Sequence, residues 1–111
     1  MQTTTLEAEV EVTAQLARFF AGIKHVHVNA FLSLQRAAQP GVGEAVVIEY
    51  AGEGKAIFKS GLPLDFGEGI CLRNSSGKQN DAKVIAVQYQ DGKTAVAAQI
   101  LNGQLSWMER P

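Results

Sequence analysis

Two histidines, His25 and His27, come nearest in this sequence to a metal site. Alternate residues of a strand point to the same side, so the two imidazoles would share one face. Imidazole is a common zinc ligand, but a zinc site needs further ligands. The single cysteine, Cys71, lies between Ile70 and Leu72, an apolar setting typical of a buried thiol. We therefore interpret the histidines as the polar outer face of a strand and predict no metal and no cofactor.

Other catalytic patterns are weaker still. The sequence has no G-x-S-x-G elbow around a nucleophilic serine. The carboxylates Glu53, Asp65 and Glu68 fall in or near turns, and no two of them are paired as in glycosidases. The stretch Gly52–Lys55 contains two glycines but lacks the phosphate-loop pattern, so a hairpin turn explains it better. These observations favour a protein that is not an enzyme.

Cations offer a binding chemistry instead. Lys55, Lys59 and Arg73 would form a small anion-binding face if the third and fourth strands were neighbours. Ordinary solvated strand surface is the alternative, and we prefer it. Lys24 and Arg36 bracket the first predicted strand and would add charge at the mouth of a barrel.

Composition limits the class of protein. The chain has 111 residues, 46% of them apolar, and a net charge of −1. This length suits one domain with one core. The near-neutral charge argues against nonspecific binding to duplex nucleic acid. One cysteine fits a reducing compartment, and no stretch resembles a membrane span or a signal peptide. We expect a soluble, cytoplasmic protein of bacterial type.

The first 23 residues are ambiguous. Residues 6–12 alternate between apolar and acidic side chains, which is a strand pattern. The spacing of Leu16, Phe19 and Phe20 with other apolar residues is helical, and Thr4 with Glu7 forms a capping box. We predict a helix from about Leu6 to Ala21. Its apolar stripe must pack on the barrel or on the same helix of a second subunit.

The rest of the chain predicts an all-β fold. Six segments alternate in hydropathy and are separated by short glycine-containing turns, with Asp91-Gly92 marking a tight hairpin. Short strands with exposed edges must be covered, and a small closed barrel does this. We predict a six-stranded antiparallel barrel over residues 24–111, preceded by a helical segment over residues 1–23. The predicted strands are His25–Arg36, Glu44–Tyr50, Lys55–Lys59, Ile70–Asn74 and the two arms of the hairpin that ends at Leu101.

The order of motifs resembles one known family. The chain contains G-x-A-x-F from Gly54 to Phe58, then LDFGEGICL from Leu64 to Leu72, then the hairpin KVIAVQY and TAVAAQIL, with Trp107 after the last strand. This order is similar to that of PilZ domains, small bacterial barrels best known for binding cyclic di-GMP. The resemblance implies a PilZ-like barrel with a signalling or regulatory role.

The ligand motifs of that family are only partly present. Its [DN]-x-S-x-x-G motif corresponds to Glu49–Gly54, where Gly54 alone is kept. Its R-x-x-x-R motif belongs before the first strand, where Lys24 is the only cation in residues 20–28. One lysine does not replace two forked guanidinium groups. The resemblance therefore implies a degenerate domain whose residual site would involve Lys24, Glu49 and Gly54.

Three functions follow from these patterns. The first is a non-enzymatic PilZ-like module that binds a protein partner, or a second copy as a homodimer, through the helix stripe of Leu16, Phe19 and Phe20. The second is a cyclic di-GMP receptor with a nonstandard site built from Lys24, Arg36 and Arg73. The third is a small nucleic-acid-binding barrel. The net charge argues against it, and so does the lack of exposed aromatic side chains clustered with lysine and arginine.

Overall fold

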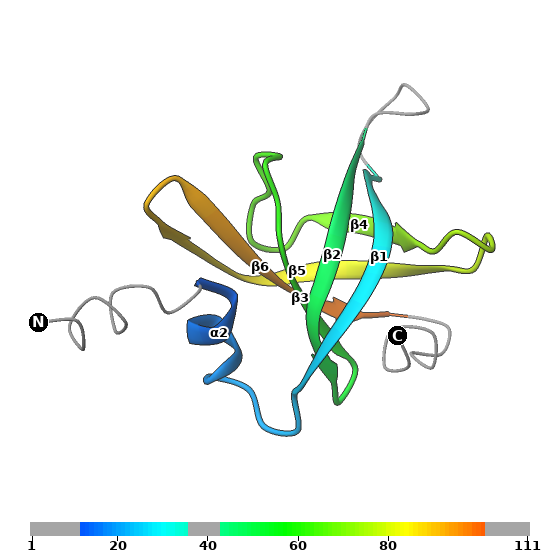
Figure 1. Cartoon of the computed structure of the whole chain (residues 1–111). Helices are drawn as coiled ribbons and strands as arrows, with labels where there is room; N and C mark the ends of the chain where they lie inside the picture. Colours follow the sequence, from blue (N-terminus) through cyan, green and yellow to red (C-terminus); the bar gives the residue numbers. More distant parts are fainter. Residues whose placement is uncertain (1–11, 36–42, 102–111) are drawn as a thin grey trace, which may run out of the picture.

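The computed structural model of the chain describes residues 12–35 and 43–101 (Figure 1). Six strands are found where the sequence predicts them, preceded by one short helix. The elements are α2 (Val12–Ala17), β1 (Lys24–Leu34), β2 (Gly43–Gly52), β3 (Lys55–Lys59), β4 (Gly69–Arg73), β5 (Gln79–Gln90) and β6 (Lys93–Ile100). Arg36 and Trp107 lie outside the described residues, as does the part of the predicted helix before Val12.

The strands close into one antiparallel barrel in the order β1-β2-β3-β6-β5-β4. The pairing of β1 with β4 closes it, with Leu32 opposite Leu72. The β5–β6 hairpin turns at Asp91 and Gly92, both with positive φ (52° and 80°), as a two-residue turn that follows the twist of its strands requires. The predicted all-β barrel is confirmed.

The barrel interior is a continuous apolar core. Along β1 every second residue from Val26 to Leu32 is buried, so this strand has one inward and one outward face. Phe58 of β3 is the largest fully buried side chain. The core consists of Val26, Val28, Ala30, Leu32, Val46, Ile48, Ala51, Ala56, Phe58, Leu64, Ile70, Leu72, Ala82, Val84, Val96 and Ala98.

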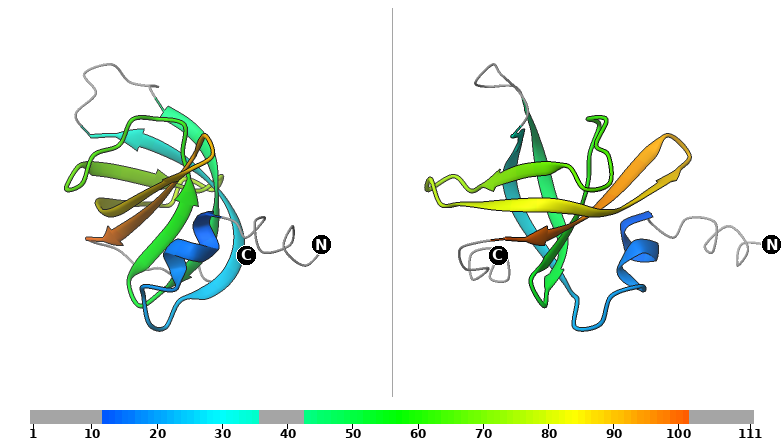
Figure 2. Two further views of the ribbon diagram at one scale, coloured as in Figure 1. Left: turned by 90° about the vertical axis from the view of Figure 1, so that its left-hand side faces the viewer. Right: turned by 180° about the vertical axis from the view of Figure 1, so that it is seen from behind.

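The helix lies against the outside of the barrel and is shorter at its end than predicted (Figure 2). It ends at Ala17, not near Ala21. The N–H groups of Arg18, Phe19 and Phe20 each donate to the carbonyl three residues earlier, at 3.1–3.3 Å, so the chain tightens into turns here. The left-handed φ of Gly22 (76°) then redirects it into β1.

No helix in the described ranges is long and apolar enough to cross a membrane.

Candidate interaction surface

The helix stripe is used mainly within the chain. Leu16 is only 4% exposed and packs in a second apolar cluster with Val12 and with Ile57, Ala95 and Ala97 of the outer barrel wall. The half-buried Phe20 joins the edge of this cluster, whereas Phe19 is 77% exposed. Of the two packing options for the stripe, the barrel is the one observed for Leu16. Leu16 therefore has little surface left to offer a partner.

Two hydrogen bonds anchor the helix to the barrel. The Thr13 hydroxyl donates to Glu49 Oε1 at 2.6 Å, and Gln88 Nε2 donates to Gln15 Oε1 at 2.9 Å. Lys59 Nζ lies 3.8 Å from Glu49 Oε2. Glu49 begins the segment aligned with the second PilZ motif, and in this chain its carboxylate holds α2 in place.

The β2–β3 turn lies against the turn that precedes β1. A Cβ atom added to Gly52 would collide with the carbonyl oxygen of Gly22, and one added to Gly22 would collide with the Glu53 side chain. Lys24 pairs in register with Ala51, so Lys24 and the Gly54 turn share this end of the barrel. The space between the two turns is thus filled by the chain itself, including an acidic side chain that disfavours an anion.

The predicted cations that the structure describes do not come together. Arg73 pairs with Phe31 on β1, seven residues along from Lys24, which corresponds to about 23 Å of extended strand. The anion-binding face considered for Lys55, Lys59 and Arg73 does not form, because β3 lies between β2 and β6, whereas β4 lies between β5 and β1. β3 and β4, although consecutive in sequence, are therefore not neighbours in this barrel.

The histidines and the cysteine have ordinary surroundings. His25 and His27 are exposed, as predicted, and the His25 ring packs edge-on against Tyr50 at 5.1 Å. The sequence predicted a buried Cys71, whereas the structure shows it half-buried. Burial raises the pKa of its thiol and so does the negative charge of Asp81, while a hydrogen bond with Ser33 and the charge of Arg73 act in the opposite direction.

A second surface was not predicted. β5 pairs with β4 only as far as Lys83, followed by backbone hydrogen bonds of Val84 with Gly67 and Glu68 at 2.7 and 2.9 Å. From residue 85 to residue 90, β6 is the only strand of the described chain beside β5. This part of the β5–β6 hairpin extends away from the barrel body (Figure 1).

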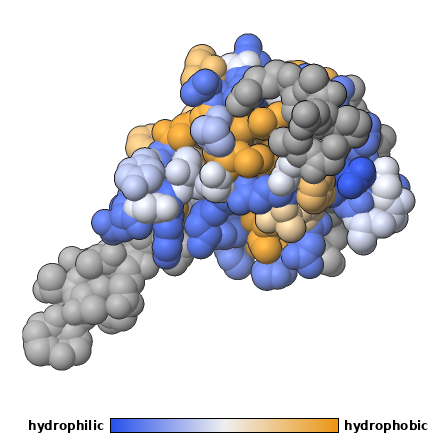
Figure 3. Space-filling view, turned by 90° about the horizontal axis from the view of Figure 1, so that it is seen from above, coloured by the Kyte–Doolittle hydropathy of each residue, from blue (hydrophilic) through white to orange (hydrophobic). Residues whose placement is uncertain are grey.

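Three exposed apolar side chains lie on β5 or in the segment beside it. Val87 is 41% exposed, Tyr89 70% and Phe66 76%. Phe66 lies beside β5 because its neighbour Gly67 is hydrogen-bonded to Val84. Seen from above, the molecule shows a patch of apolar surface bordered by hydrophilic residues (Figure 3). We call Phe66, Val87, Tyr89 and the edge of β5 from residue 85 to residue 90 the hairpin surface.

A signal for this surface was present in the sequence. The segment of residues 83–90 (KVIAVQYQ) is longer than the preceding strand segment of residues 70–74 (ICLRN). Part of β5 therefore had to extend beyond its pairing with β4. The register shift between Val84 and Ala86 was not visible, and it changes which residues face outward.

The fold and the hairpin surface define a small closed antiparallel barrel with a helix on its outer wall and an open edge on β5 among the described strands. Compared with known proteins, the chain matches no family model and no curated protein.

Proposed function

We propose that this chain is a non-enzymatic PilZ-like barrel that acts by binding another protein chain through the hairpin surface. The observation that carries the proposal is the coincidence of exposed apolar side chains with an unpaired strand edge. Phe66, Val87 and Tyr89 supply apolar area, and the β5 edge supplies backbone N–H and C=O groups to an added strand. The interaction site thus moves from the helix stripe to the hairpin.

The sequence of this edge supports the proposal. Exposed edges are commonly protected from pairing by charged residues, proline or very short length. Residues 85–90 read IAVQYQ, with no charge and no proline. Gln88 and Gln90 add no charge to this edge, and the Gln88 amide is hydrogen-bonded to Gln15 of α2. Such an edge can accept an extended segment in register.

A second copy of this chain is the occupant that we propose first. Two β5 edges can pair antiparallel about a two-fold axis, because the same surface then serves both subunits. In that arrangement Val87 and Tyr89 of each subunit would lie near the same residues of the other. This homodimer needs no additional protein.

Light scattering over a range of concentrations tests the proposal. We expect a dimer that the Val87→Lys and Tyr89→Lys double variant converts to a monomer, because two lysines on each edge bring like charges together. The matched control is Phe19→Lys, which places a charge on the exposed aromatic residue of the helix side. If Phe19→Lys dissociates the dimer and the double variant does not, the interface is the helix, as the sequence first suggested.

The cyclic di-GMP receptor is a weaker alternative. The separation of Lys24 from Arg73 argues against the nonstandard site. The closeness of Glu53 to Gly22 argues against a dinucleotide at the position that the family resemblance implies. We expect no heat on calorimetric titration with cyclic di-GMP. Micromolar binding that is lost in Lys24→Gln would overturn this expectation.

A further inference from the structure

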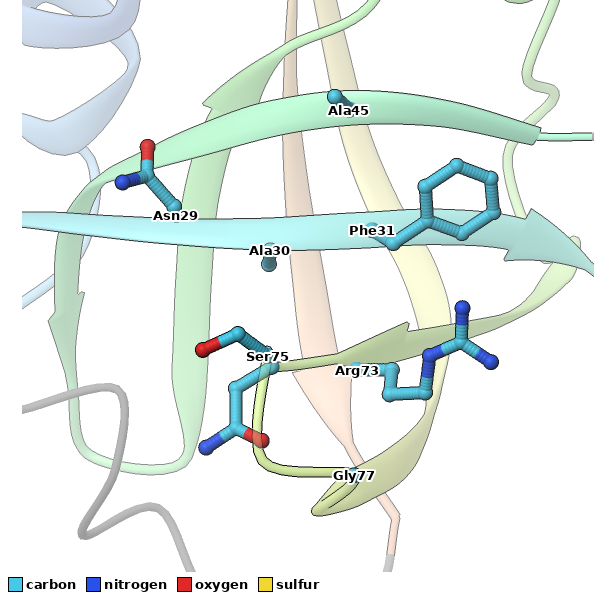
Figure 4. Close-up of a pocket in the computed structure, with 8 residues that line it drawn as sticks. Asn29, Ala30, Phe31, Ala45, Arg73, Ser75 and Gly77 are labelled. Carbon is cyan, nitrogen blue, oxygen red and sulfur yellow. The ribbon is translucent and has the colours of Figure 1, made fainter.

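A pocket of about 490 Å³ opens where β1 separates from β4. The two strands pair only from Phe31 to Leu34 of β1. Before that point, the turn that joins β4 to β5 lies across from β1 and leaves a concave space (Figure 4). Small-molecule sites in proteins typically have volumes of about 300–1,000 Å³. Asn29, Ala30, Phe31, Ala45, Arg73, Asn74, Ser75 and Gly77 line the pocket.

One end of the pocket is cationic and aromatic. The Arg73 Cζ lies over the Phe31 ring, 5.4 Å from its centre, a cation–π contact that restrains a long side chain. Within the described residues, no carboxylate forms an ion pair with Arg73, and none lines the pocket. Asp81 lies opposite Cys71 in the β4–β5 pairing. Its negative charge acts on the Cys71 thiol. The guanidinium therefore has N–H donors to offer a ligand.

The other end of the pocket is neutral and polar. Asn74 Oδ1 accepts hydrogen bonds from the N–H groups of Ser76 and Lys78 at 3.0 and 2.9 Å, which fixes the amide group within the turn. Among the described residues, none accepts a hydrogen bond from its Nδ2. Ser75 faces Ala30 of β1 across the space. Arg73 of β4 lies beside Phe31, farther along β1 (Figure 4). The pocket thus runs from a cation, past small apolar side chains, to hydroxyl and amide groups.

We propose that this pocket binds a small molecule that carries an oxyanion, a carboxylate or a phosphate, at the Arg73 end. The planar fork of a guanidinium matches the oxygens of either group and forms two parallel hydrogen bonds. The cation–π contact with Phe31 holds the fork in place before binding, which lowers the entropic cost of association. The body of the ligand would lie along Ala30, with a hydrogen-bonding group near Ser75. This site is separate from the hairpin surface and does not depend on it.

Amide chemical shifts of the ¹⁵N-labelled full chain test the proposal, with AMP, inorganic phosphate and citrate as separate probes. We expect saturable shifts at Phe31 and in residues 73–77 with at least one probe. AMP alone would indicate a phosphate ester, phosphate alone an inorganic anion, and citrate alone a carboxylic acid. Arg73→Gln should weaken binding by about tenfold or more, and Arg73→Lys by less, because lysine keeps the charge without the fork.

Lys78→Gln is the matched control, since it removes one positive charge from the same turn without changing a residue that lines the pocket. It should leave the affinity almost unchanged. The proposal is overturned if no probe shifts these amides. It is also overturned if Arg73→Gln and Lys78→Gln weaken binding equally, which would show general charge attraction. The Val87→Lys and Tyr89→Lys double variant should bind the probe as the unmodified chain does, so the two proposals can fail separately.

Discussion

The two faces of the β5–β6 hairpin carry apolar residues, but only one face is fully covered by the chain. On one face, Ala95 and Ala97 are completely buried beneath α2. On the other face, Val96 is buried in the barrel, whereas Val87 directly opposite it is 41% exposed and Tyr89 is 70% exposed. The hairpin is therefore longer than the barrel that it helps to close. The difference separates apolar surface that the fold uses from apolar surface that remains for a partner.

The largest expected effect comes from removing the helix anchor. Leu16→Ala should lower the free energy of unfolding by about 2–4 kcal/mol, because it empties a buried position between α2 and β6. Val87→Ala truncates an aliphatic side chain on the uncovered face and should cost about 0.5 kcal/mol or less in the monomer. Urea unfolding of both variants at a concentration where the chain is monomeric measures the two values. Equal losses would show that the two faces are equally part of the fold.

A smaller effect is expected at the turn that leads the helix onto the barrel. Gly52 has a φ of 150°, and a Cβ there would meet the backbone of Gly22, so Gly52→Ala should cost about 2 kcal/mol through strain and displacement. Gly77 also has positive φ (92°), but nothing lies within 4 Å of an added Cβ. Gly77→Ala should therefore cost only about 1 kcal/mol. Thermal unfolding compares the stability of the two variants. A smaller loss for Gly52→Ala than for Gly77→Ala would mean that the β2–β3 turn does not contact the turn at Gly22 closely.

The smallest expected effect concerns the polar contact under the helix. Thr13→Val keeps the shape of the side chain but removes the donor to Glu49 Oε1, and it should cost about 1 kcal/mol. Thr94 lies on the uncovered face, and its hydroxyl forms no side-chain hydrogen bond with a described residue. Thr94→Val should therefore leave the free energy of unfolding almost unchanged. Chemical denaturation of the two variants measures both changes in the free energy of unfolding. A loss at Thr94 as large as that at Thr13 would contradict the comparison.

The strands were predictable because their signals are local. Alternating hydropathy marks each strand, and Asp91-Gly92 fixes the register of the last hairpin. The order of strands around the barrel was not predictable in the same way, since it depends on pairings between distant segments. For that reason Lys55, Lys59 and Arg73 were expected on neighbouring strands, and the barrel order separates them.

The exposed residues were the hardest part to foresee. An apolar residue in an alternating strand is normally expected in the core, and a one-residue register shift reverses the side on which later residues lie. The shift between Val84 and Ala86 places Val87 opposite Val96, and Val87 and Tyr89 are exposed there because β5 extends beyond its pairing with β4. The pocket at Arg73 likewise depends on where β1 stops pairing with β4, which no local pattern reveals.

The closed strand order also has a consequence for how the chain folds. The β5–β6 hairpin joins adjacent segments through a two-residue turn, whereas the pairings of β1 with β4 and of β3 with β6 connect distant ones. Local pairings form quickly, and closure of long loops is slow. We expect the hairpin to form early, before the remaining strands close the barrel. During refolding at high concentration, its uncharged edge would then be the first place where chains aggregate.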